Sequence, residues 1–240
     1  MTRPPGDAQA PNDPPVAALR WHTLGWQSFL AELETYKERF LDGGVNKQEL
    51  HYIQCLRAFE GHDSTTRAAR ARYLVAFLNR WECRLVAQTA EQQLREWIRA
   101  RTDRLDALQG VSIHDESYLD HLNELVALYD EIMLLRQPRP GLHNWSDACA
   151  SKTLGQLAPS AFVIWDNAIK GYSARDYWTF LADMHELALR LVAESPADDG
   201  PALEAWLQSH LQYVPRKTVA KFLDEYNWHV AVGRGYARRL

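Results

Sequence analysis

The sequence is poor in the residues and runs that mark several large classes of protein. Only three cysteines occur among 240 residues, at Cys55, Cys83 and Cys149, and they are far apart. Their number and spacing exclude a CxxC motif and a disulfide framework, and favour a reducing cytoplasm. No apolar run approaches the roughly 20 residues that a membrane helix needs, and the N-terminus lacks the apolar core of a secretion signal. We therefore expect a soluble cytoplasmic protein with no membrane partner.

The sequence also lacks the motifs of the commonest nucleotide-binding proteins, hydrolases and metalloenzymes. It contains no Walker loop, no GxGxxG fingerprint, no GxSxG elbow and no HExxH motif. His114 and His121 lie two turns apart near Asp115 and Asp120, but no Cys/His cluster accompanies them. We therefore predict no metal site and no cofactor. The formal net charge of −4 indicates no nucleic-acid partner, although patches rather than totals bind phosphate.

Helix-period hydrophobic patterning is abundant. Residues 1–18 are rich in proline and poor in apolar residues, which predicts a disordered tail. Residues 19–240 show apolar positions three or four apart and no convincing strand alternation, and 46% of the chain is hydrophobic, so we predict a single all-α domain. It would be a compact multi-helix domain, with two helical lobes around a cleft as one arrangement. The expected helices span 46–59, 63–81 (capped by Asp63 or Ser64), 89–110 (capped by Thr89), 115–135, 173–192 (capped by Ser173), 201–211 and 215–229.

The most informative segment runs from Ser151 to Tyr172 and reads SKTLGQLAPSAFVIWDNAIKGY. A helix with Lys152 near its start ends at Pro159, an apolar run follows, and Asp166 stands where the next helix begins. Because a helix rises about 1.5 Å per residue and extended chain about 3.3 Å, the run can return along the helix and bring Asp166 to Lys152. An amine desolvated among small apolar neighbours can attack an electrophilic carbon. Asp166 is also a good N-cap, and its carboxylate can stabilise a developing positive charge.

Arginine and tryptophan suggest further contacts. Ten arginines, no lysine and six acids occur between Arg57 and Arg104. Within this stretch Arg67 and Arg70 are candidates for binding DNA phosphates, because the guanidinium fork suits phosphate; the alternative is a solvated face. Trp145 and Trp165 are the tryptophans nearest to the Lys152 segment. They either line a base pocket, where indoles stack on bases, or belong to the core.

The order of these features resembles the catalytic segment of the helix-hairpin-helix DNA glycosylases, most nearly the 8-oxoguanine and archaeal GO glycosylases. Lys152 is followed by TLGQLAP, then FVIW, then Asp166, and the likeness covers residues 135–177. The resemblance implies an enzyme that flips a damaged or modified base out of duplex DNA. Lys152 would attack C1′, expel the base and leave a Schiff base, after which elimination of the 3′ phosphate can follow. Asp166 would stabilise the oxocarbenium-like sugar.

The resemblance also implies a DNA contact before the lysine. In the family a glycine-rich hairpin grips a phosphate there, whereas this chain has PRPGLHNW at 138–145, with one glycine and a longer path. Arg139, His143 and Asn144 are the candidates for contact with the DNA backbone. The four cysteines that bind an iron–sulfur cluster in some members are absent from the sequence. The implied partner is double-stranded DNA with a damaged or modified base, and we expect a monomer acting in DNA repair or in defence against phage DNA.

Two other classes of function fit the same residues. A non-enzymatic helical module that binds nucleic acid or protein would hold Lys152 and Asp166 as a structural ion pair. A Schiff-base enzyme acting on a small carbonyl compound would use Lys152 without DNA. The sequence does not identify the excised base.

Overall fold

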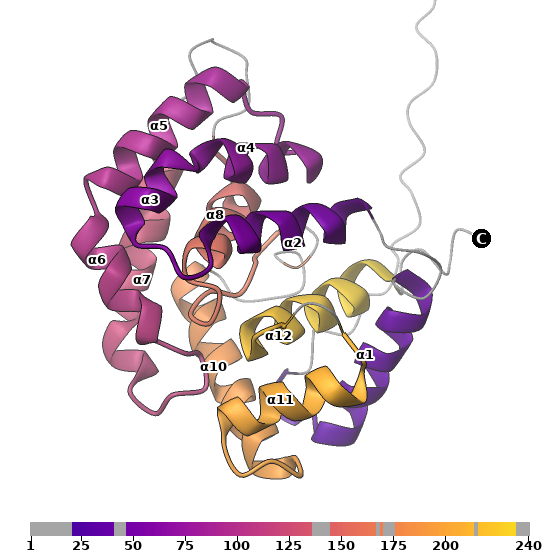
Figure 1. Ribbon diagram of the computed structural model, residues 1–240. Coiled ribbons are helices and arrows are strands. Elements are labelled where there is room, and N and C mark those ends of the chain that lie inside the picture. Colours follow the sequence, from indigo (N-terminus) through magenta and orange to yellow (C-terminus); the bar gives the residue numbers. More distant parts are fainter. Residues whose placement is uncertain are drawn as a thin grey trace, which may run out of the picture.

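Helices make up the regular structure of the protein in the computed structural model (Figure 1). The structure describes residues 21–40, 47–135, 145–166, 169, 176–213 and 216–233. These ranges contain no β-strand, which confirms the predicted all-α class. None of the helices in these ranges is long and apolar enough to cross a membrane. The proline-rich residues 1–18 lie outside the described residues.

The first half of the chain forms short helices that pack on one another. In chain order they are η1 (Trp21–Thr23), α1 (Trp26–Phe40), α2 (Lys47–Phe59), α3 (Ser64–Ala69), α4 (Ala71–Arg80), α5 (Ala87–Arg99), α6 (Thr102–Ala107) and η2 (Leu108–Gly110). Asp63 caps α3 as predicted, because its carboxylate accepts a hydrogen bond from the Thr66 amide at 2.8 Å. α2 packs on α4, while α3 and α4 pack on α5.

Two helices predicted as continuous are broken in the structure. The expected helix 63–81 divides at Arg70, whose backbone leaves the helical region (φ −100°, ψ 11°). The expected helix 89–110 divides near Arg101 (φ −130°, ψ 22°). Thr89 is not an N-cap: α5 begins two residues earlier at Ala87, after Val86, which offers no capping side chain. Apolar periodicity persisted across both breaks, so the pattern did not indicate them.

The second half of the chain contains the two longest of the described helices. In chain order its described helices are α7 (Tyr118–Met133), α8 (Asp147–Leu157), α10 (Tyr177–Glu194), α11 (Gly200–His210), α12 (Val219–Trp228) and η3 (His229–Gly233), and the two longest are α7 and α10. Asp176 caps α10 through the Thr179 amide at 2.8 Å, while the predicted cap, Ser173, lies outside the described residues. α10 packs on α7 and on α12, and α1 packs on α12, so helices from the beginning and the end of the described chain lie side by side (Figure 1).

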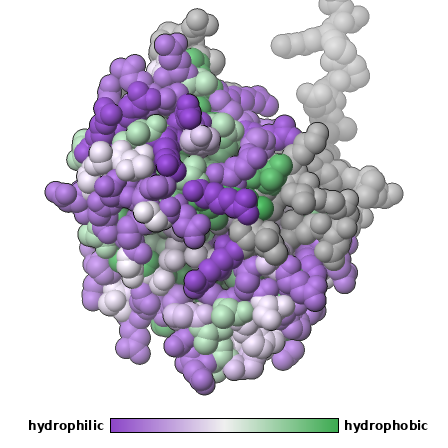
Figure 2. Space-filling view, viewed as in Figure 1, coloured by the Kyte–Doolittle hydropathy of each residue, from purple (hydrophilic) through white to green (hydrophobic). Residues whose placement is uncertain are grey.

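α8 lies at the centre of the molecule. Its residues from Cys149 to Leu157 are all buried, and it packs against α7, α4 and α2. One hydrophobic cluster runs from α1 through α8 to α12. The face seen in Figure 2 is mostly hydrophilic, with hydrophobic residues in small separate groups, because the apolar stripes of the helices face inward. Any polar side chain that α8 carries is therefore held inside the protein.

Candidate functional site

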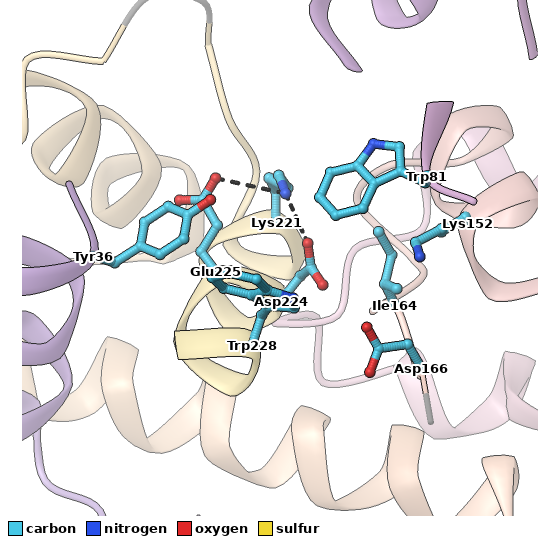
Figure 3. A pocket seen from close by; sticks show the side chains of 9 residues that line it. All are labelled: Tyr36, Trp81, Lys152, Ile164, Asp166, Lys221, Asp224, Glu225 and Trp228. Carbon is cyan, nitrogen blue, oxygen red and sulfur yellow. Dashed lines mark hydrogen bonds and ion pairs between the residues drawn. The ribbon is translucent and has the colours of Figure 1, made fainter. Parts of the chain in front are cut away.

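Lys152 and Asp166 line the same cavity (Figure 3). Lys152 comes from α8 and Asp166 from the extended segment after that helix. The opposite wall is formed by α1 and α12. The full lining consists of Tyr36, Trp81, Lys152, Ile164, Asp166, Lys221, Asp224, Glu225 and Trp228. The structure therefore brings the two predicted catalytic side chains together.

The local sequence explains how the segment after α8 returns along that helix. The Trp165 amide donates to the hydroxyl of Ser151 at 3.0 Å, which places the neighbour of Asp166 beside the neighbour of Lys152. The returning segment packs on α8 at Gly155, where a Cβ would lie at an ordinary contact distance of 3.7 Å from Ile164 Cγ1. The Asp166 carboxylate accepts from the Ile169 amide at 3.2 Å, which is the hydrogen bond expected of an N-cap.

Lys152 is a buried cation without a carboxylate partner among the described residues. Its side chain is 5% exposed, and its Nζ lies 4.9 Å from the centroid of the Trp81 ring. No described residue forms a hydrogen bond or an ion pair with Nζ, and none links it to Asp166. Burying a charge without a paired opposite charge costs much free energy. The ring of Trp81 offsets part of that cost through a cation–π contact.

The thiols of Cys83 and Cys149 lie near the Lys152 ammonium. Cys149 is one turn before Lys152 on α8. A hydrogen bond from Cys83 lowers the pKa of Cys149, with the Ser146 hydroxyl and the charge of Lys152 acting in the same direction. The same hydrogen bond, together with burial, raises the pKa of Cys83. The Cys149 thiol and the Lys152 ammonium therefore interact electrostatically within α8.

The opposite wall carries a buried network of charges that the sequence analysis did not predict. Lys221 Nζ lies 2.7 Å from Asp224 Oδ2 and 3.6 Å from Glu225 Oε1. Lys217 Nζ lies 2.5 Å from the same oxygen of Glu225. All four side chains are buried: Lys221, Asp224 and Glu225 lie on α12, and Lys217 lies just before it. Their spacing of three and four residues could have indicated this network, because side chains at that spacing are neighbours on a helix.

Asp224 connects this network to the two predicted catalytic residues. Burial raises the pKa of Asp224, and the negative charge of Asp166 raises it further. The ion pair with Lys221 and the charge of Lys152 oppose that rise without cancelling it. The field of Lys152 and Asp166 therefore reaches across the cavity, and a carboxyl in such surroundings retains a proton more readily than one in water.

The cavity is narrow. Its volume is about 20 Å³, which is enough for about one water molecule. A nucleobase is far larger, so it could enter only if the walls moved apart. Trp81 and Trp228 are the partly buried indoles of the lining, and Tyr36 is the aromatic contribution from α1. Their flat rings are the surfaces on which a base could stack once the cavity opened.

The structure places the two predicted base-pocket tryptophans in the core. Trp145 is 1% exposed, and its indole nitrogen donates to Gln93 at 3.4 Å. Trp165 is 2% exposed and stacks on Tyr177 and Phe180. Neither indole lines the cavity. Both tryptophans therefore belong to the core, which was the alternative prediction. Their closeness to Lys152 in the sequence did not determine whether each ring would face the cavity or the core.

Arg67 is not available to bind a DNA phosphate, contrary to the prediction. It is 6% exposed and donates to the carbonyls of Phe59 (3.3 Å) and Leu157 (2.9 Å) and to Gln109 Oε1 (2.6 Å). These acceptors occupy its guanidinium, so it holds the end of α8 in place. Arg70 is half-buried and donates to the Ala58 carbonyl at 2.9 Å. The predicted DNA-backbone residues Arg139, His143 and Asn144 lie outside the described residues.

The chain matches no protein-family model, and no curated protein or solved structure is significantly similar to it. Within the ranges that the structure describes, no group of three or more His, Cys, Asp and Glu side chains could hold a metal ion.

Proposed function

We propose that the protein is a DNA glycosylase that removes a damaged or modified base, with Lys152 as the nucleophile and Asp166 as the stabilising carboxylate. The observation that carries the proposal is that Lys152 is buried at a cavity and has no carboxylate partner among the described residues. A charge kept in such a place costs stability.

The reaction follows from the two side chains. After the Lys152 ammonium has given a proton to water, the amine would attack C1′ of the deoxyribose while the bond from C1′ to the base nitrogen breaks, and a second amine proton would pass to the departing base. The carboxylate of Asp166 would stabilise the positive charge that develops on the sugar. Opening of the sugar ring would leave a Schiff base at Lys152, and elimination of the 3′ phosphate would complete a lyase step.

The non-enzymatic alternative predicted a structural ion pair between Lys152 and Asp166. No such ion pair is present between these two described residues, so that feature does not support a binding module. The narrow cavity bears on a different second candidate. A volume of about 20 Å³ admits neither a base nor a carbonyl compound until the walls move, but a small carbonyl compound requires less opening, and an enzyme acting on it would form the same Schiff base at Lys152.

Borohydride trapping separates these functions. The protein is incubated with duplex DNAs carrying varied lesions, with phage DNA containing modified bases, and with small aldehydes and ketones. We expect a covalent adduct and a new abasic site on at least one DNA, and loss of both in Lys152→Gln. Lys37→Gln, on α1 and outside the cavity lining, is the matched control and should behave as the wild type.

Each other outcome points to a different function. Adducts formed with small carbonyl compounds and with no DNA would favour the small-carbonyl enzyme. The absence of adducts and of abasic sites on every substrate would contradict the glycosylase proposal and leave the binding module as the better account.

A further inference from the structure

A groove lined by arginines opens on the surface between α2 and α4, two helices that pack side by side (Figure 1). Its volume is about 680 Å³, within the range of about 300–1,000 Å³ that ligand sites occupy. Among the described residues, none lines both this groove and the cavity of Lys152 and Asp166. No described acidic side chain lines the groove. The described lining consists of Gln54, Arg57, Ala58, Ala69, Arg70, Arg72 and Tyr73.

The three arginines come from three segments of the chain. Arg57 is exposed in the last turn of α2, Arg70 is half-buried at the break between α3 and α4, and Arg72 is exposed in the first turn of α4. None of the three forms an ion pair with a described carboxylate, whereas Arg101 and Arg104 form ion pairs with glutamates. A groove lined by one sign of charge attracts the opposite sign. The groove is therefore suited to a ligand with several negative charges.

Two of these guanidinium groups are positioned by neighbouring groups. Arg70 Nη1 donates to the Ala58 carbonyl at 2.9 Å, and Arg72 Nη2 donates to the Tyr73 hydroxyl at 3.1 Å. A guanidinium has five N–H donors, so one such hydrogen bond leaves others for a ligand. A side chain that is already positioned loses less conformational freedom when it binds, which favours affinity. The planar fork of arginine also suits phosphate.

Tyr73 adds a flat aromatic surface to the groove. Its side chain is 41% exposed, and the guanidinium carbon of Arg72 lies 4.9 Å from the centroid of its ring. Nucleobases stack on aromatic rings and on guanidinium planes. The groove thus combines two kinds of surface, one for phosphates and one for bases. A ligand that alternates phosphates and flat rings along a chain is a nucleic acid.

We propose that this groove binds a single strand of nucleic acid, with phosphates on Arg57 and Arg70 and an unpaired base on the surface of Arg72 and Tyr73. The strand is single because a base within a duplex is stacked between its neighbours and does not present its face. The proposal does not depend on the glycosylase activity, since the described lining does not include Lys152.

Fluorescence anisotropy on the full-length protein tests the proposal. The probes are labelled oligothymidylate and oligouridylate, which distinguish DNA from RNA, a duplex of oligothymidylate with oligoadenylate, and a strand of tetrahydrofuran abasic units that has phosphates but no bases. We expect at least one single strand to bind more tightly than the duplex and the baseless strand, and to bind more weakly as the salt concentration rises. Lys152→Gln should bind as the wild type does, so this test and the borohydride test can fail separately.

Substitutions in the groove separate the two kinds of contact. Arg57→Gln should weaken binding of every strand and lower the slope of log affinity against log salt by about 0.7, the value for one phosphate contact on a single strand. Tyr73→Ala should weaken binding of the single strand by at least about fivefold and leave the baseless strand unaffected. Tyr73→Phe keeps the ring and should retain the binding that Tyr73→Ala loses. Arg99→Gln, at an exposed position of α5 outside the lining, is the matched control and should bind as the wild type does.

The substituted side chains are exposed, so we expect the variants to melt at the temperature of the wild type. If a variant proves unstable, the comparison of strands in the wild type decides the question. Absence of binding by both single strands, binding of the duplex or the baseless strand that is as tight, or unchanged binding by folded Arg57→Gln and Tyr73→Ala proteins would overturn the proposal. Binding of a serine-phosphorylated peptide in place of both strands would also overturn it and assign the groove to a protein partner.

Discussion

Lys152 and Lys221 are both buried beside one cavity, and they differ in what surrounds them. Lys221 has Asp224 at 2.7 Å and Glu225 at 3.6 Å, whereas no described carboxylate forms an ion pair with Lys152. The proposed reaction therefore assigns the nucleophile to Lys152, whereas Lys221 is held by its carboxylates in the opposite wall.

Asp166→Asn tests the carboxylate at the residue scale. Asparagine caps helices about as well as aspartate, so the fold should be retained while the negative charge is lost. We expect base excision to fall by about 10²- to 10³-fold, the effect typical of losing one electrostatic stabiliser. Single-turnover release of the base on the responsive DNA measures it. Asp176→Asn makes the same change at the N-cap of α10 and should leave excision unchanged; undiminished excision in Asp166→Asn would refute its role.

Lys217 is predicted to matter for stability rather than for the reaction. It is 1% exposed and lies 2.5 Å from Glu225, which is equally buried. Lys217→Met would leave the Glu225 carboxylate with Lys221 as its charged neighbour at 3.6 Å, so we expect a loss of about 3–5 kcal/mol in the free energy of unfolding. Urea denaturation measures that loss. Lys217→Met with Glu225→Gln should lose less than Lys217→Met alone, because the buried charge is then removed as well.

At the element scale, the same substitution is expected to have opposite effects on stability at two glycines that lie in helices. A Cβ on Gly155, in the interior of α8, would meet Ile164 and the Phe162 carbonyl at an ordinary 3.7 Å. A Cβ on Gly200, at the start of α11, would lie 1.9 Å from the His114 ring. We expect Gly155→Ala to stabilise the protein by up to about 1 kcal/mol, and Gly200→Ala to destabilise it. Thermal unfolding of both variants decides the signs, and equal effects would contradict the packing described around α8.

The elements around Lys152 also show which parts of the candidate site could be predicted from the sequence. The helix that begins before Lys152, the extended return and the capping Asp166 were predicted, because each depends on neighbours in the sequence. The charges of α12 that face Lys152 were not, because they become neighbours only through packing about 70 residues later in the chain. Arg67 was misplaced for a related reason: an arginine on an amphipathic helix has the same local pattern whether its guanidinium meets water or a buried carbonyl.

At the scale of the whole molecule, burial of carboxyl groups links stability to pH. Burial raises the pKa of Asp224 and of Glu204. Between the unfolded pKa, near 4, and the raised folded pKa, the folded protein binds more protons than the unfolded chain. Its free energy of unfolding therefore falls as the pH rises through that window. The groups whose pKa is lowered, such as Glu131, act in the opposite direction at lower pH.

Asp224→Asn isolates one part of this dependence. The variant cannot ionise at that position, so its stability relative to the wild type should improve as the pH is raised from about 4 toward neutrality. Chemical denaturation of both proteins across this range provides the measurement. A difference that stays constant with pH would show that Asp224 titrates alike in the folded and unfolded states.

The central claim is that Lys152 forms a Schiff base with the sugar of DNA. Its most direct test is borohydride reduction of the protein on duplex DNA that carries a single abasic site, followed by peptide mapping of the adduct by mass spectrometry. This substrate requires no knowledge of the target base. We predict a deoxyribose adduct on the peptide containing Lys152, and no adduct in Lys152→Gln. An adduct on another lysine, or a wild-type protein that forms none, would contradict the account.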